Sequence, residues 1–255
     1  LAEAAVWLPL ALCGVEWARR GRYWAGIVVA GVALGFQALA IHINITLMSG
    51  LLVGLYTPAV FVLPPPQAAA AGTAVWRPTA VARRLLAGCA ALVVIGAIGF
   101  GLSAVQLLPL YELGTTSFRS RGLAPGFAAV NSVAPINLLT LLLPNALGGT
   151  VTRSGWGLWV PWETAIYVGL LPLILALLAW LRPSFYVVLW WAVALGALLV
   201  AFGDLGPWPL WDRVRSLPLF NTLQSPGRFG LFSTLAVAVL AAHGAAALEC
   251  VAAQA

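Results

Sequence analysis

Two carboxylates and a group of arginines are the residues of this 255-residue chain with the types and positions to do chemistry. Glu112 and Glu163 flank a long segment of mixed polarity. A carboxylate in such a place can act as a general base and take the proton of an attacking hydroxyl. Forked guanidinium groups suit the charge of a phosphate. Arginines lie in this segment and in a later one, and four of them are candidates for such a role: Arg119, Arg121, Arg213 and Arg228.

The elements that must position these residues are membrane-spanning helices. The chain is 62% hydrophobic and only 8% charged, with a mean hydropathy of +0.98. So few charges cannot cover a globule of this size, which argues against a soluble enzyme, a nucleic-acid binder and a disordered chain. The alternation of polar and apolar residues typical of a transmembrane barrel is absent from the apolar runs. We therefore predict an all-α, polytopic transmembrane helix bundle.

About seven apolar runs approach the roughly 20 residues that cross about 30 Å of hydrocarbon. Their ranges are 3–18, 23–41, 43–63, 85–110, 164–181, 184–203 and 229–248. We treat residues 1–255 as a single transmembrane domain. Because the chain begins with Leu1, we expect it to be part of a longer protein.

The arginines also set the expected orientation. Short links between runs carry clusters of arginine, which favours the cytoplasmic side for these links: Arg19, Arg20, Arg22, Arg77, Arg83, Arg84 and Arg182. The segments 111–163 and 204–228 then form two long exoplasmic loops. This distribution explains the net charge of +6 better than nucleic-acid binding does. Trp208 and Trp211 would be anchors at the exoplasmic rim.

One stretch inside the first long loop, 135–143, is mostly Leu and Ile around Asn137 and Thr140. It is too short to cross a bilayer, and its leucines need an apolar surface. We predict a short helix that lies in the interface or re-enters the bundle.

Several short motifs follow one another in a characteristic order. They are Gln106-Leu-Leu-Pro109 with Glu112, Ser117-Phe-Arg119-Ser120, Leu143-Pro144-Asn145, Glu163 followed by Tyr167-Val-Gly169, and Pro226-Gly-Arg228. Their order and spacing resemble those of the YfhO-type bacterial membrane proteins, from about residue 30 to residue 245. That family is similar to glycosyltransferases of the GT-C fold.

The resemblance implies transfer of a sugar from a polyprenyl-phosphate donor to a cell-envelope acceptor, at the exoplasmic face of the bacterial inner (cytoplasmic) membrane. Glu112 and Glu163 are then the candidate catalytic residues. The candidate substrate-binding residues are Arg119, Arg121, Asn145, Tyr167 and Arg228. The resemblance also implies an acidic catalytic residue in a first exoplasmic loop, which we expect to precede Leu1. The cofactor is unknown, with a divalent metal as one candidate, although no metal-ligand spacing occurs.

Each of these residues also has a structural interpretation. Glu112 and Glu163 could be solvated or paired with a nearby arginine, and Arg119 and Arg121 could bind lipid headgroups or close salt bridges. Asn145 could cap a turn, and Tyr167 could anchor a span end.

Two other functions stay open. A non-catalytic membrane subunit would dock a protein partner through its exoplasmic loops. A transporter of lipid-linked sugars is less favoured, because spans two to seven contain no Asp, Glu or Arg. The expected partners are membrane lipid and a polyprenyl-phosphate sugar, and no nucleic acid.

Overall fold

The computed structural model of the chain describes residues 2–40, 42–65, 76–117, 120, 122–148, 161–164, 166–208, 210–217 and 219–253. Every regular element among these residues is a helix, which confirms the all-α prediction. The contacts within the chain divide it into two compact units, Leu1–Ser120 and Arg121–Ala255. Each unit is described by itself, and the single transmembrane domain stays a prediction.

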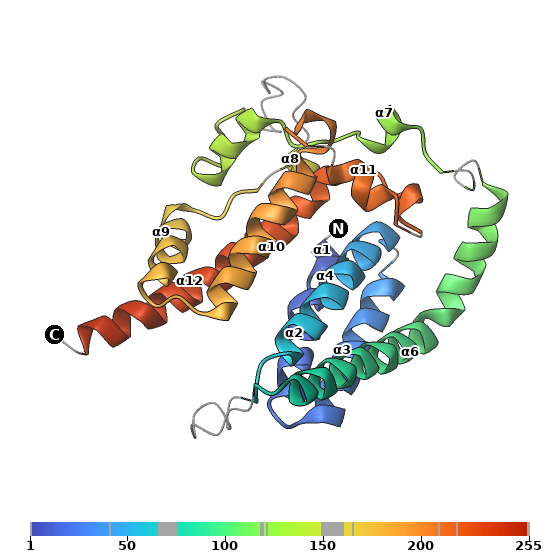
Figure 1. The fold of residues 1–255 in the computed structure, drawn as a ribbon. Coiled ribbons are helices and arrows are strands. Elements are labelled where there is room, and N and C mark those ends of the chain that lie inside the picture. Colours follow the sequence, from blue (N-terminus) through green and yellow to red (C-terminus); the bar gives the residue numbers. More distant parts are fainter. Residues whose placement is uncertain are drawn as a thin grey trace. The chain divides into compact units, whose positions relative to one another are not determined.

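The first unit is made of long apolar helices (Figure 1). They are α1 (Ala2–Ala5), α2 (Trp7–Arg19), α3 (Tyr23–Leu39), α4 (Ile43–Phe61) and α6 (Pro78–Thr116). The turn between α2 and α3 includes Gly21, whose φ of +100° is open to glycine and strained for other residues. At the last residue of α2, just before this turn, the side chain of Arg19 donates to the carboxylate of Glu16 and to the carbonyl of Pro64. These contacts fix the ends of α2 and α4 together.

Small residues let the helices of the first unit approach closely. A Cβ on Gly14 would lie 2.6 Å from the carbonyl oxygen of Gly26, so the backbones of α2 and α3 touch there. Further along α3, Gly31 packs against Ile98 of α6 and Gly35 packs against Leu102 of α6. Spacing two glycines four residues apart is a common way to pack helices in membranes. The glycines of α3 therefore hold it between α2 and α6.

Helix α6 is longer than the sequence predicts. It has 39 residues, which corresponds to about 58 Å at 1.5 Å per residue. Figure 1 shows it bending toward its C-terminal end, where Pro109 lies inside the helix and cannot donate a backbone hydrogen bond. Residues 111–116 are therefore helical, and the expected loop 111–163 begins about one and a half turns later than predicted.

The second unit surrounds three helices with many short ones. The main helices are α9 (Leu170–Leu178) with the 3₁₀ helix η3 (Ala179–Leu181), α10 (Phe185–Ala201) and α12 (Gly230–Ala252). The short helices are α7 (Pro125–Ala128), η2 (Pro135–Leu141), α8 (Pro161–Thr164), η4 (Gly203–Leu205), α11 (Leu210–Arg215), η5 (Phe220–Thr222) and η6 (Pro226–Phe229). Both α9 and α10 pack against α12, and Gly244 of α12 contacts the backbone of Leu175.

One predicted boundary in the second unit is wrong, and one predicted loop contains short helices. The apolar run 164–181 becomes a helix only from Leu170, because Gly169 takes a φ of +87° that helices do not allow. The segment 204–228, which the sequence predicts as a loop, contains the short helices η4, α11, η5 and η6. A run of apolar residues does not reveal such breaks, because they depend on backbone conformation.

The predicted short helix at 135–143 is present as the 3₁₀ helix η2. Its polar residues Asn137 and Thr140 are buried, whereas Ile136 and Leu139 are exposed, as are the following Leu142 and Leu143. This pattern is the reverse of a helix on a water-soluble protein. It suits the apolar environment that the sequence predicts for these leucines.

Among the residues that the structure describes, three helices are long and apolar enough to cross a membrane: Ile43–Phe61, Pro78–Thr116 and Pro226–Ala252. Tyr23–Leu39, Leu170–Leu181 and Phe185–Ala201 are apolar but shorter. The expected seven runs thus correspond to helices, of which three meet the length of a full span. Large apolar side chains along α6, such as Leu86, Val93 and Val105, are exposed, as expected for a surface that faces lipid.

Candidate functional site

The strongest polar contact of the second unit joins Glu163 and Arg228. Nε and Nη2 of Arg228 each donate to a carboxylate oxygen of Glu163 at 2.7 Å. Both side chains are only 11% exposed. Two parallel bonds in a partly desolvated place make this a strong, geometrically defined pair. It ties α8 to η6, which lie 65 residues apart in the sequence.

The backbone around this pair is unusually tight. Asn131 and Ser225 both have positive φ angles, and the Asn131 side-chain amide donates to the Ser225 hydroxyl at 3.2 Å. A Cβ on Gly227 would contact the carbonyl oxygens of Asn131 and Glu163. Residues in such uncommon conformations persist only where the surroundings hold them. Three separate segments, at 131, 163 and 225–228, therefore meet at one rigid junction.

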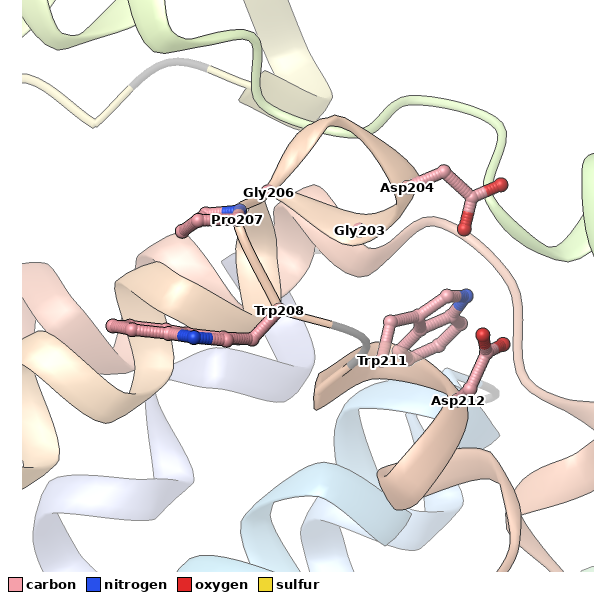
Figure 2. A pocket seen from close by; sticks show the side chains of 7 residues that line it. All are labelled: Gly203, Asp204, Gly206, Pro207, Trp208, Trp211 and Asp212. Atoms are coloured by element: carbon pink, nitrogen blue, oxygen red, sulfur yellow. The ribbon is translucent and has the colours of Figure 1, made fainter.

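An open cavity of about 320 Å³ lies next to this junction, and Figure 2 shows the residues that line it. Gly203 lines the cavity and also contacts the junction. A Cβ on Gly203 would meet the Ser132 side chain and, at 2.7 Å, the ring of Pro226. The rest of the wall comes from residues 204 and 206–208 and from the first turns of α11. Its volume is at the lower end of the range for small-molecule sites. The residues that line the cavity come directly after the C-terminal end of α10 in the sequence. Helices α10 and α12 pack together, and α12 begins near this end of α10.

Two carboxylates and two indole rings line this cavity: Asp204, Asp212, Trp208 and Trp211. Asp204 is exposed, and within the described part of the chain it has no hydrogen-bond or ion-pair partner. Asp212 makes a long 3.8 Å ion pair with Arg215, whose Nη2 also donates to the carbonyl of Leu123. The cavity is therefore acidic, with one carboxylate fully available to a ligand.

Trp211 is the best-fixed side chain of the wall. It is 1% exposed, and its ring packs edge-on against Phe229 at 6.3 Å between centroids. Its indole N–H has no hydrogen-bond partner. Figure 2 shows this nitrogen on the edge of the ring that faces the carboxylates of Asp204 and Asp212.

Of the residues predicted to form a site, the structure brings together Glu163 and Arg228. Asn145 and Tyr167 belong to the same unit and are exposed, Tyr167 to 50%. Glu112 is exposed on the last turns of α6 in the first unit. Arg119 and Arg121 lie outside the described residues, so their roles stay predictions. Pairing explains Glu163 without a catalytic role, which is one of the alternatives that its position leaves open.

The sequence analysis did not select the cavity residues. It treats Trp208 and Trp211 only as anchors at the exoplasmic rim and assigns no role to Asp204 or Asp212. A sequence signal for the cavity does exist. Two Asp and two Trp residues fall within ten residues of an otherwise apolar chain, and such a local concentration of polar and aromatic side chains could have indicated a site. Among the residues that the structure describes, no group of three or more His, Cys, Asp or Glu side chains could hold a metal ion.

Comparison of the chain with protein-family models, with curated proteins and with solved structures finds no match. The likeness to YfhO-type proteins therefore depends on the order of the short motifs alone. Arguments about function must come from the geometry of the cavity and of the Glu163–Arg228 junction.

Proposed function

We propose that this chain is the membrane part of a glycosyltransferase-like protein that moves a sugar from a polyprenyl-phosphate donor to a cell-envelope acceptor. The proposed setting is the exoplasmic face of the bacterial cytoplasmic membrane. Two arginine clusters support this orientation, since such clusters stay cytoplasmic: Arg20 and Arg22 at the turn between α2 and α3, and Arg83 and Arg84 near the beginning of α6. In this proposal the three shorter apolar helices and α2 join the three long ones to make seven crossings.

The observation that carries the proposal is a free carboxylate in a cavity beside the ends of two apolar helices. Asp204 has this position, at the end of α10 and near the beginning of α12. A sugar acceptor must lose its hydroxyl proton as it attacks, and a carboxylate without a competing cation can take that proton. Glu163 is less suited to this role, because Arg228 already occupies both of its oxygens.

The proposed step balances without any further reactant. The acceptor oxygen bonds to the anomeric carbon, and the bond from that carbon to the phosphate oxygen breaks. The acceptor proton passes to Asp204, and the lipid phosphate leaves with the bonding electrons. Arg213, exposed on α11 next to Asp212, offers a cation for the charge that develops on the phosphate.

The test measures transfer by the full-length protein in nanodiscs. Radiolabelled polyprenyl-phosphate glucose, galactose, mannose and N-acetylglucosamine are each supplied with isolated cell-envelope acceptor. Release of polyprenyl phosphate is followed by chromatography. Asp204→Asn is expected to reduce the rate by about a hundredfold or more, as for loss of a general base. The matched control is Glu249→Gln, an exposed carboxylate on α12 of the same unit, which should leave the rate unchanged.

Two results would contradict the proposal. One is no turnover of any of these donors by a folded wild-type protein, which would favour the non-catalytic subunit. The other is full activity of the Asp204→Asn variant. That result would remove the cavity from the chemistry and return attention to Glu112.

A further inference from the structure

The acidic cavity contains a donor that nothing in the described chain satisfies. The indole N–H of Trp211 is buried, lacks a hydrogen-bond partner and faces the carboxylates of Asp204 and Asp212 (Figure 2). An unpaired polar group in such a place is costly, so most of those in native proteins have a partner. The missing partner must accept from the indole and also suit two carboxylates, which only accept.

A hydroxyl group is the common ligand group that meets both demands. Its oxygen can accept from the Trp211 N–H while its hydrogen is donated to Asp204 or Asp212. An ammonium group would be attracted by the carboxylates, but it has no lone pair for the indole N–H. A phosphate could accept from the indole, but it would be repelled by two negative charges. The donor-and-acceptor pattern therefore selects a neutral ligand with hydroxyl groups.

The second indole gives the cavity an apolar side. Trp208 is 59% exposed, and in Figure 2 its ring lies on the side of the cavity away from the two carboxylates. An exposed aromatic face beside polar groups fits a molecule with one apolar face and a polar edge. A sugar ring has this form, because its C–H groups cover one face and its hydroxyl groups lie around the edge.

We propose that this cavity binds a pyranose ring, stacked on Trp208 and hydrogen-bonded through its hydroxyl groups to Trp211 and the two aspartates. The identification of this ring as the acceptor in sugar transfer rests on the proposed function. The donor phosphate then binds outside the acidic cavity. Binding of the ring itself needs no donor and can be tested without turnover.

The experiment is saturation-transfer NMR on the full chain in nanodiscs, with methyl glucoside, methyl galactoside and methyl N-acetylglucosaminide as probes. Choline and inorganic phosphate serve as the cationic and anionic probes. At least one glycoside should show saturation transfer, and both ions should show none. Trp208→Ala should weaken glycoside binding by about tenfold or more, and Trp208→Phe, which keeps an aromatic face, by much less.

Two more variants separate a binding role from a folding role. Trp211→Phe keeps a ring against Phe229 but removes the N–H, so it should weaken glycoside binding while the protein stays folded. Trp24→Ala removes an exposed indole of the first unit and should leave binding unchanged. Circular dichroism and size-exclusion chromatography check that each variant is folded.

The possible failures are distinguishable. If no glycoside binds, or if choline alone binds, the inference is overturned, whatever the result of the transfer assay. Equal glycoside binding by the wild type and the Trp208→Ala variant would also reject it. If glycosides bind as expected but no donor is consumed, the cavity is a sugar site and the proposed transfer is wrong.

Discussion

The described ion pairs of the two units differ in the longest sequence separation that they bridge. The ion pairs described in the first unit join neighbours, since Glu16 contacts Arg19 and Arg20, three and four residues later. In the second unit, Glu163 and Arg228 are 65 residues apart. The Asn131 and Ser225 side chains, which also bond to each other, are separated by 94 residues.

This difference indicates where each unit can change without losing its fold. Two of the hydroxyl groups buried in the first unit donate to carbonyls of their own helices, Ser103 to Gly99 at 2.7 Å and Thr57 to Val53 at 2.8 Å. Helices of this kind keep their backbone bonds even if their neighbours move. The junction and cavity of the second unit need several distant segments in place at once. We therefore expect the second unit to be more sensitive to loss of a single polar partner, and the first to loss of close helix contacts.

The largest effect is expected at the junction of the second unit. Glu163→Leu leaves the Arg228 guanidinium partly buried without its carboxylate. Breaking such a pair should lower the free energy of unfolding by about 3 kcal/mol, the lower end for buried pairs, because some exposure remains. Thermal and denaturant unfolding in detergent, followed by circular dichroism, would measure it.

Two comparisons make this prediction specific to the junction. The double variant with Glu163→Leu and Arg228→Leu should recover much of the loss, because no unpaired charge stays buried. Asp212→Ala breaks only a 3.8 Å pair to a 61% exposed carboxylate and should cost less than about 1 kcal/mol. A cost for Glu163→Leu as small as that for Asp212→Ala would show that the junction does not depend on this pair.

A smaller effect is expected from closing the helix contact of the first unit. Gly26→Ala puts a methyl group against the backbone of Gly14 and Ala18, and a backbone cannot move aside as a side chain can. Overpacking of this kind should lower the free energy of unfolding by about 2 kcal/mol. The matched control is Gly54→Ala on α4, where an added Cβ meets nothing within 4 Å. If both variants unfold alike, close backbone packing is not what holds α2 to α3.

The sequence predicts the first unit better than the second, for physical reasons. Apolar runs of helical length determine α3 and α4, whose bounds differ from the expected ranges by two residues at most. Helix α6 continues past its apolar run, because Glu112 and its neighbours keep helical backbone bonds after hydrophobicity ends. In the second unit, the break at Gly169 is a matter of backbone angle, and apolar composition does not indicate it.

The candidate site shows the same limit. Glu163 and Arg228 could be selected as charges in an apolar chain, and their positions at the ends of apolar runs are visible in the sequence. The sequence does not show that Glu163 and Arg228 bind each other, because this pairing depends on how η6 packs against α8. The cavity is harder still, since it exists only when the turn after α10 folds back toward α11. Residue type predicts which groups are available, whereas contacts between distant segments decide which of them stay free.

The smallest expected effect tests the first unit at its own buried polar pair. The amide of Gln37 on α3 donates to the hydroxyl of Ser49 on α4 at 2.9 Å, and both side chains are fully buried. Hydrogen bonds between membrane helices contribute about 0.6 kcal/mol on average, because the separated helices find other partners. A double-mutant cycle with Gln37→Leu and Ser49→Ala should therefore give a coupling energy near that value, well below the cost expected for Glu163→Leu.

The amide oxygen of Gln37 has no partner, so Gln37→Leu alone also removes an unsatisfied group and should cost little. A coupling of about 3 kcal/mol, as large as the loss expected at the junction, would mean that the first unit too depends on a particular polar contact, and the contrast between the units would fail.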